Sequence, residues 1–103
     1  MIFKNDGDII RKNNSGNQYW AGGKIFRKVG SHMFGSDGSR TVDQGNIMFK
    51  NNKKTIRVSG SYLFTSDGDR YVLNGNILFG PHGEQWRGVS SIEEAKSIIS
   101  MNL

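Results

Sequence analysis

The sequence lacks cysteine altogether, has a single proline and contains no long apolar run. Without cysteine there is no disulfide staple, thiol nucleophile or thiolate metal site, which is compatible with a reducing compartment. No apolar run approaches the roughly 20 residues of a membrane helix, so we expect no membrane partner. The polar first residues carry no secretory signal, which favours a cytoplasmic location, although a mature form with its leader removed would look the same.

Glycine is abundant instead, with 14 copies in 103 residues, and together with the lone proline this indicates many tight turns. The length fits one domain, 1–103. Fourteen lysines and arginines against nine acidic residues give a net charge of +5. A net charge of this size favours solubility, and its positive sign permits an anionic partner.

The glycines mark a repeat of 15 residues, which is the strongest signal in the chain. Four regular units cover 30–44, 45–59, 60–74 and 75–89. Two degenerate units precede them, 1–14 and 15–29, and 90–103 follows as a C-terminal segment. An aromatic residue occupies position five of the last five units: Tyr19, Phe34, Phe49, Phe64 and Phe79.

Each unit contains two turn signals of the kind that close β-hairpins. Asp-Gly occurs at 37–38 and 67–68, and the unit junctions place glycine after Gln44, Ser59 and Asn74. Only strands of about four to six residues fit between such turns. The sequence therefore predicts about twelve short antiparallel strands in a meander.

The facing of the side chains depends on turn length, which the sequence leaves open. Two-residue turns would place Phe64 opposite Tyr71 and flip successive units. A three-residue Ser-Asp-Gly turn would place Phe64 opposite Arg70 and Leu63 opposite Tyr71, and would keep the facing. The units that begin at Gly30 and Gly60 also resemble each other more than their neighbours, which indicates a second period of 30.

The C-terminal segment has a helical pattern. Residues 91–94 read Ser-Ile-Glu-Glu, a capping box, and Ile92, Ala95, Ile98 and Ile99 follow at helical spacing. We expect a short amphipathic helix over about 91–100. A helix of this length is marginal alone, so its apolar face must pack on the sheet.

Twelve strands would expose unpaired edges unless the sheet were closed or covered. We therefore predict an all-β fold in which six hairpin units form a closed or nearly closed radial array. The position-five aromatics would form its inner ring, and the helix would plug or cover it. A flat two-layer sandwich is the alternative.

The unit pattern resembles that of small bacterial and phage proteins with tandem Gly-Asn-x-x-Phe-Gly-Ser-Asp-Gly repeats, including the five-fold beta-flowers. The matching segments are 30–31, 34–38, 64, 66–68 and 75–80. The resemblance covers about 30–89 and implies a flower-like β architecture without a known activity. A sixth unit and the C-terminal helix are additional to the five-fold pattern.

Catalytic and metal-binding patterns are weak. His32 and His82 occupy repeat positions that other units fill with unrelated residues, which indicates tolerated strand and turn residues. The aspartates of the Ser-Asp-Gly turns lack the alternating acidic spacing of a calcium loop. We expect no enzyme activity, no metal and no cofactor. A small active or inhibitory site in the central hole, near either histidine, is a third hypothesis.

The arginines favour a binding function, because each unit carries one. Candidate residues for an anionic partner are Arg40, Arg57, Arg70, Arg87, Lys50, Lys53 and Lys54. Regular arginines beside aromatics can hold single-stranded nucleic acid. They can equally cover apolar surface and discourage edge pairing.

Positions three to five are all apolar in the last three units, so these strands have apolar side chains on both faces. This pattern favours a subunit contact or a layered fold. Our first hypothesis is a non-catalytic β-repeat scaffold that acts as a protein-interaction or assembly module, with a protein partner or a second copy. The alternative is a nucleic-acid-binding protein.

Overall fold

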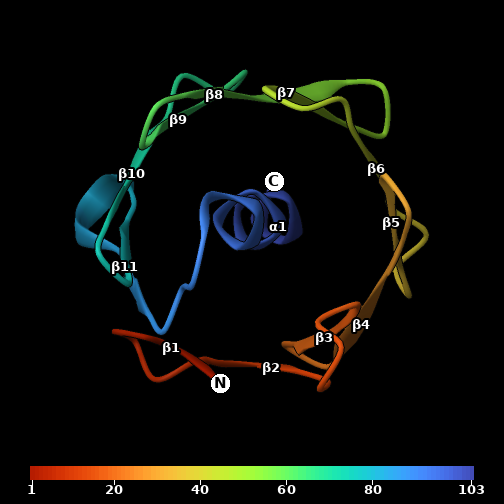
Figure 1. Cartoon of the computed structure of the whole chain (residues 1–103), viewed down its shortest axis with the longest axis horizontal. Helices are drawn as coiled ribbons and strands as arrows, with labels where there is room; N and C mark the ends of the chain where they lie inside the picture. The colour runs from red at the N-terminus through yellow and green to blue at the C-terminus, as the bar shows by residue number, and fades with distance from the viewer.

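The computed structural model describes all residues, 1–103, and shows a closed antiparallel barrel with a helix along its axis (Figure 1). The strands are β1 (Ile2–Lys4), β2 (Ile9–Lys12), β3 (Gln18–Ala21), β4 (Lys24–Val29), β5 (His32–Gly35), β6 (Arg40–Asp43), β7 (Ile47–Lys50), β8 (Lys54–Ser59), β9 (Tyr62–Thr65), β10 (Arg70–Asn74), β11 (Ile77–Phe79) and β12 (Gln85–Arg87). A 3-10 turn, Pro81–Gly83, precedes β12, and helix α1 spans Ile92–Asn102.

The barrel closes between its first and last strands, where Phe3 lies opposite Arg87 and Lys4 opposite Trp86. Every other strand pairs with its neighbours in sequence, so the sheet has no free edge. The predicted closed radial array of hairpins is confirmed, and the flat sandwich is wrong. Closure removes the exposed ladder that would otherwise recruit further strands.

The Ser-Asp-Gly turns are three-residue loops. Phe64 lies opposite Arg70 and Leu63 opposite Tyr71. The Thr65 amide donates to the Asp69 carbonyl at 3.0 Å, and Gly68 has a φ of +91°. That backbone conformation suits glycine, which has no Cβ to clash. The second of the two registers is therefore present, and all units keep the same facing.

Six cross-strand pairs form the inner ring of the barrel, and of the predicted position-five aromatics only Tyr19 is among them. The pairs are Ile2–Ile10, Tyr19–Phe26, Met33–Thr41, Met48–Ile56, Leu63–Tyr71 and Leu78–Trp86. All twelve residues are buried. Phe34 and Phe64, by contrast, are 43% and 41% exposed on the outer wall.

The prediction of an inner aromatic ring was wrong for a geometric reason. Successive strand residues point to opposite faces, so position five faces outward once position four faces inward. The axis is occupied by α1, and the aromatic side chains that face it are Tyr19, Phe26, Tyr71 and Trp86 of the inner ring.

Tyr19 differs from the four phenylalanines. It is buried opposite Phe26, as Leu63 is opposite Tyr71, so it occupies position four, and Trp20 occupies position five. The shift arises because the β3–β4 turn has only two residues, between Ala21 and Lys24. The degenerate second unit therefore begins one residue later than its spacing predicted.

Helix α1 confirms the predicted C-terminal helix and fills the lumen. The Ser91 hydroxyl accepts a hydrogen bond from the Glu94 amide at 3.2 Å, which caps the first turn. Ala95, Ile98 and Ile99 are fully buried against the inner ring. The protein has no helix with the length and apolarity that a membrane crossing requires.

Candidate functional site

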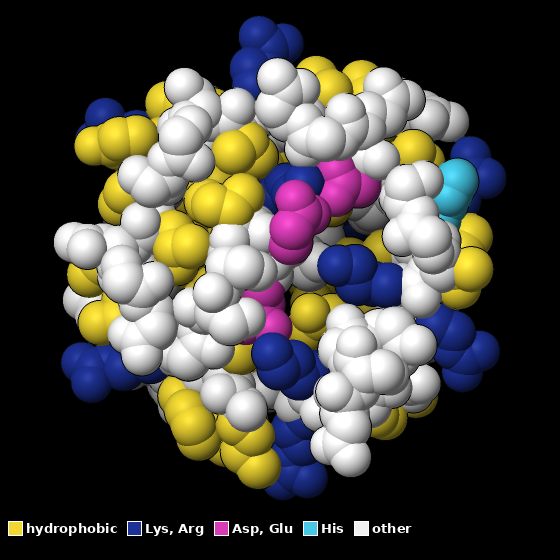
Figure 2. Space-filling model, viewed as in Figure 1, with side chains coloured by type: hydrophobic (Ala, Val, Ile, Leu, Met, Phe, Trp, Pro, Cys, Tyr) yellow, Lys and Arg dark blue, Asp and Glu magenta, His cyan; other side chains and the backbone are white.

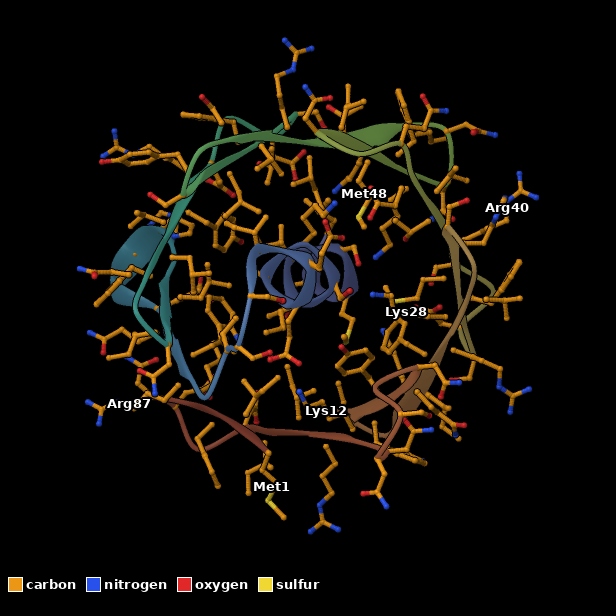
Figure 3. The ribbon with its side chains drawn as sticks, in the orientation of Figure 1. Met1, Lys12, Lys28, Arg40, Met48 and Arg87 are labelled. Atoms are coloured by element: carbon orange, nitrogen blue, oxygen red, sulfur yellow. The ribbon has the colours of Figure 1, made fainter.

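The outer wall carries a band of arginine and aromatic side chains, which we call the outer belt. It comprises Arg11, Arg27, Arg40, Arg57, Arg70, Arg87, Phe3, Trp20, Phe34, Phe49, Phe64 and Phe79. All six arginines are exposed. Arg40 and Arg87 extend away from the barrel in Figure 3.

The guanidinium groups of the outer belt have no acidic partners. All seven ion pairs in the structure are made by lysines. Six carboxylates lie in the turns at one mouth: Asp6, Asp8, Asp37, Asp67, Asp69 and Glu84. The other three, Asp43, Glu93 and Glu94, meet lysines where α1 enters the barrel. Figure 2 shows acidic and basic side chains next to one another at the centre of the mouth where α1 enters, and further basic side chains on the outer wall.

Two phenylalanines of the outer belt are each placed between two arginines. Phe34 lies opposite Arg27 on β4 and opposite Arg40 on β6. Phe64 lies opposite Arg57 on β8 and opposite Arg70 on β10. Neighbouring strands are about 4.8 Å apart, so each of these phenylalanines has an arginine on the adjoining strand at either side.

A second ring extends each of these surfaces along the strand. His32 stacks on Phe34 with ring centroids 5.9 Å apart, and Tyr62 stacks on Phe64 at 6.4 Å. The Arg70 guanidinium lies 5.8 Å from the centroid of the Tyr62 ring. Each pair of rings forms an aromatic platform, with an arginine on the strand at either side of its phenylalanine.

The remaining aromatics of the outer belt have different neighbours. Phe49 lies between Val42 and Thr55, and it is half-buried. Phe79 lies between Val72 and Gln85 and is half-buried as well. The predicted aromatic series is therefore divided, and only Phe34 and Phe64 have arginine on both sides.

Phe3 and Trp20 each have an arginine on one side and an isoleucine on the other. Phe3 lies between Arg87 and Ile9, and Trp20 lies between Arg11 and Ile25. These residues belong to the degenerate units, and they make the wall of β1–β4 the most apolar part of the belt.

The predicted lysine cluster does not join the outer belt. Lys50 is 6% exposed, and its ammonium donates to the carbonyl oxygens of Ser100 and Leu103 at 2.7 Å each. Burial lowers its pKa. Lys54 pairs with Asp67 across two turns at 3.2 Å, and Lys53 is exposed in the β7–β8 turn. Lys50 was misassigned because position six faces the lumen, as position four does.

Buried charges hold the helix in the lumen. Lys96 is 1% exposed and donates to both carboxylate oxygens of Asp43, at 3.0 and 2.9 Å. Burial opposes ionisation of Asp43, but the hydrogen bonds from Lys96 and the Gly45 amide outweigh it and lower its pKa. Glu94 is similarly stabilised as a carboxylate by Lys12 and by Ser90, which lower its pKa despite burial.

Glu94 also acts on Tyr19 of the inner ring. Burial and the neighbouring Glu94 carboxylate raise the pKa of Tyr19 to about 12.

Figure 3 shows Lys12 and Lys28 directed from the wall toward α1. Lys28 makes no ion pair and lines a cavity of about 100 Å³ with His32, Asp43, Glu93 and Ser97.

The histidines of the third hypothesis lie far apart in the fold. His32 is at the mouth where α1 enters, and His82 is exposed in the 3-10 turn at the other mouth. The central hole itself is filled by α1. No group of three His, Asp or Glu side chains is arranged to hold a metal ion. The charged groups inside the barrel hold α1 in place. The outer belt is therefore the candidate functional site.

Comparison with protein-family models, with curated proteins and with solved structures gives no match to this chain. Arg27 belongs to the one-per-unit series but was not among the candidate residues, Tyr62 was not singled out, and His32 was considered only for an active site. The missing signal is the pairing across the junctions between units, which places Arg27 opposite Phe34 and Arg57 opposite Phe64. His32 and Tyr62 lie two residues before these phenylalanines on the same strand face.

Proposed function

We propose that the chain is a non-catalytic β-repeat scaffold whose outer belt binds single-stranded nucleic acid. The observation that carries this proposal is the set of six exposed arginines without a carboxylate partner, two pairs of which flank exposed phenylalanines. Arginine binds phosphate through a planar fork of donors, and it is more weakly hydrated than lysine.

The aromatic rings supply the second half of the interaction. A base that stacks on an exposed aromatic side chain contributes about 1–3 kcal/mol, and every base has a face that can stack. Phe34 and Phe64 offer such faces, with guanidinium groups within reach of the adjoining phosphates. This combination supports binding with little preference for sequence.

A single strand fits the outer belt better than a duplex does. In a duplex the base faces are already stacked, so outward phenylalanines would find only base edges and backbone. Duplex DNA admits a helix or a two-stranded ribbon into its major groove. The barrel presents neither, since its strands form one continuous curved wall.

The direct test is binding of a fluorescent oligothymidylate to the triple variant R40A/R57A/R70A. A matched control removes three positive charges at the turns, K24A/K53A/K54A. We expect the belt variant to lose most of its affinity and the control to stay within about threefold of wild type. Equal loss of affinity in both variants would show that net charge alone accounts for binding. Unchanged affinity in the belt variant would reject the proposal.

A second candidate function is self-association through the wall of β1–β4. Phe3, Ile9, Trp20 and Ile25 are exposed there on adjoining strands. Asp8 and Arg11 border this patch, and neither makes an ion pair. A two-fold contact with a second copy would set each Asp8 against the other copy's Arg11 and cover the apolar side chains.

Sedimentation velocity over a range of concentrations tests this second candidate. We expect the wild-type chain to dimerise as concentration rises and the variant I9E/I25E to remain monomeric. A wild-type chain that stays monomeric at high concentration would exclude this assembly and leave nucleic-acid binding as the only proposed function of the wall.

A further inference from the structure

We infer that the outer belt contains two equivalent nucleotide-binding sites, which one sufficiently long single strand occupies together. This inference rests on the proposed function. Site A consists of Arg27, His32, Phe34 and Arg40, and site B consists of Arg57, Tyr62, Phe64 and Arg70. Each member of site B lies 30 residues after its counterpart in site A.

The turn of the central strand is hydrogen-bonded to the preceding strand in the same way at both sites. The Ser36 amide donates to the Ile25 carbonyl at 2.8 Å, and the Ser66 amide donates to the Thr55 carbonyl at 3.0 Å. The hydroxyls of both serines accept in return, from the amides of Ile25 and Thr55, at 3.0 Å in each case.

This reciprocal link ties the turn of the central strand to the preceding strand. It occurs at β5 in site A and at β9 in site B. Both turns also contain a glycine in the left-handed region, Gly38 at +87° and Gly68 at +91°. Because these links match, the central strands and their turns are held in the same way at the two sites.

No third site of this kind exists on the belt. The counterpart of Phe34 and Phe64 in the first unit is Phe3, which has Arg87 on one side but Ile9 on the other. Phe49, between sites A and B, has no arginine directly opposite. The expected number of equivalent sites is therefore two.

The spacing of the sites sets the length of strand that can bridge them. Phe34 on β5 and Phe64 on β9 are four strands apart, or about 19 Å along the wall at about 4.8 Å per strand. A stacked strand that advances about 3.4 Å per nucleotide needs about six nucleotides for this distance. An oligomer of about four nucleotides should reach one site, and one of about twelve should reach both.

The wall between the sites favours passage of a polyanion. The outward side chains there include Val42, Ile47, Phe49 and Thr55, none of which is acidic. Asp43, at the end of β6, faces the lumen and is bound to Lys96. A bridging strand therefore meets no exposed carboxylate along this path.

Calorimetric titration with oligothymidylates of about four and about twelve nucleotides tests the two-site arrangement. The variants are R27A/R40A for site A and R57A/R70A for site B, with K24A/K53A as the matched control. For wild type and control we expect two short oligomers per chain but one long oligomer. Each site variant should bind one short oligomer.

The affinity for the long oligomer gives an independent measure. Because linked sites reinforce each other, we expect each site variant to lose at least tenfold affinity for the long oligomer while its remaining short-oligomer affinity is unchanged. One short oligomer per wild-type chain, or an effect confined to one variant, would overturn the inference and leave the proposed function standing. An absence of any oligomer binding would instead reject the proposed function.

The different second rings provide a further check on equivalence. His32 and Tyr62 occupy matching places in the two sites. The variant H32Y converts the ring of site A to that of site B, and it should retain two short oligomers per chain with closely similar affinities. Loss of one site in H32Y would show that the two sites are not equivalent and would overturn the inference.

Discussion

The ammonium nitrogen of Lys96 lies 2.9 Å from a carboxylate oxygen of Asp43, and this pair joins the central helix to the barrel wall. The same ammonium also donates to the Gly45 carbonyl at 2.9 Å. Lys12 and Glu94 make a second link between wall and helix, and Lys50 binds the last turn of the helix. The polar side of α1 is therefore fixed to the lumen at both ends.

Replacing Asp43 with alanine should destabilise the fold by about 2–3 kcal/mol, because the buried Lys96 ammonium then keeps only Glu93, which is itself 64% exposed, as a carboxylate partner. Urea unfolding measures this loss. The matched control is D67A, which breaks the exposed pair with Lys54 and should cost less than about 1 kcal/mol. Equal costs in the two variants would contradict the assigned role of the buried pair.

Stability should fall in acid because Asp43 and Glu94 have lowered pKa values in the folded state. In the unfolded chain these carboxyls titrate near about 4, so below that pH the unfolded state binds more protons. Their contribution is complete above about pH 5 and is lost as pH falls through the native pKa values. Urea unfolding between about pH 3 and 7 should show this slope, and D43N should reduce it. A slope unchanged in D43N would assign the acid sensitivity to other groups.

Truncation of two neighbouring residues of β9 should destabilise the fold to very different extents. Leu63 is fully buried in the inner ring, and L63A should cost about 2–4 kcal/mol through lost burial and a cavity. Phe64 faces outward, and F64A should cost about 1 kcal/mol or less. Thermal or urea unfolding measures both. A larger loss for F64A would mean that the barrel has the opposite facing.

The three-residue β9–β10 turn predicts how substitutions at Gly68 change the stability of the fold. Its φ of +91° is strained for a side chain, and nothing lies within 4 Å of a Cβ placed there. We expect G68A to cost about 1–2 kcal/mol from backbone conformation alone. G68N should cost less, because asparagine tolerates positive φ, as Asn51 and Asn52 do elsewhere in this chain. Equal costs for the two substitutions would argue against this account of the turn.

The sequence predicted the repeat, the hairpins, the closure of the sheet and the C-terminal helix. These features depend on local signals, namely glycine spacing, turn residues and a capping box. The facing of the strands was not predictable, because Ile77, Leu78 and Phe79 are all apolar and alternation gave no sign of which side is inside. Which strand face points inward depends on the turn length and on the C-terminal helix, which occupies the lumen.

The candidate site was predicted in part for the same reason. One arginine per unit was visible in the sequence, but the pairing of Phe34 with Arg27 and of Phe64 with Arg57 joins residues of different units. Lys50 looked like part of a surface cluster with its sequence neighbours. Its inward position follows from the register, which sequence neighbours do not reveal.

The salt dependence of oligothymidylate binding tests the central claim most directly. Each phosphate contacted on a single strand contributes about −0.7 to the slope of log affinity against log salt concentration. Two sites with two arginines each should give a slope of about −3 for a long oligomer, and R40A/R57A/R70A should bring it to about −1. No measurable affinity at low salt, or a slope near zero for the wild-type chain, would contradict the claim that the outer belt binds nucleic acid.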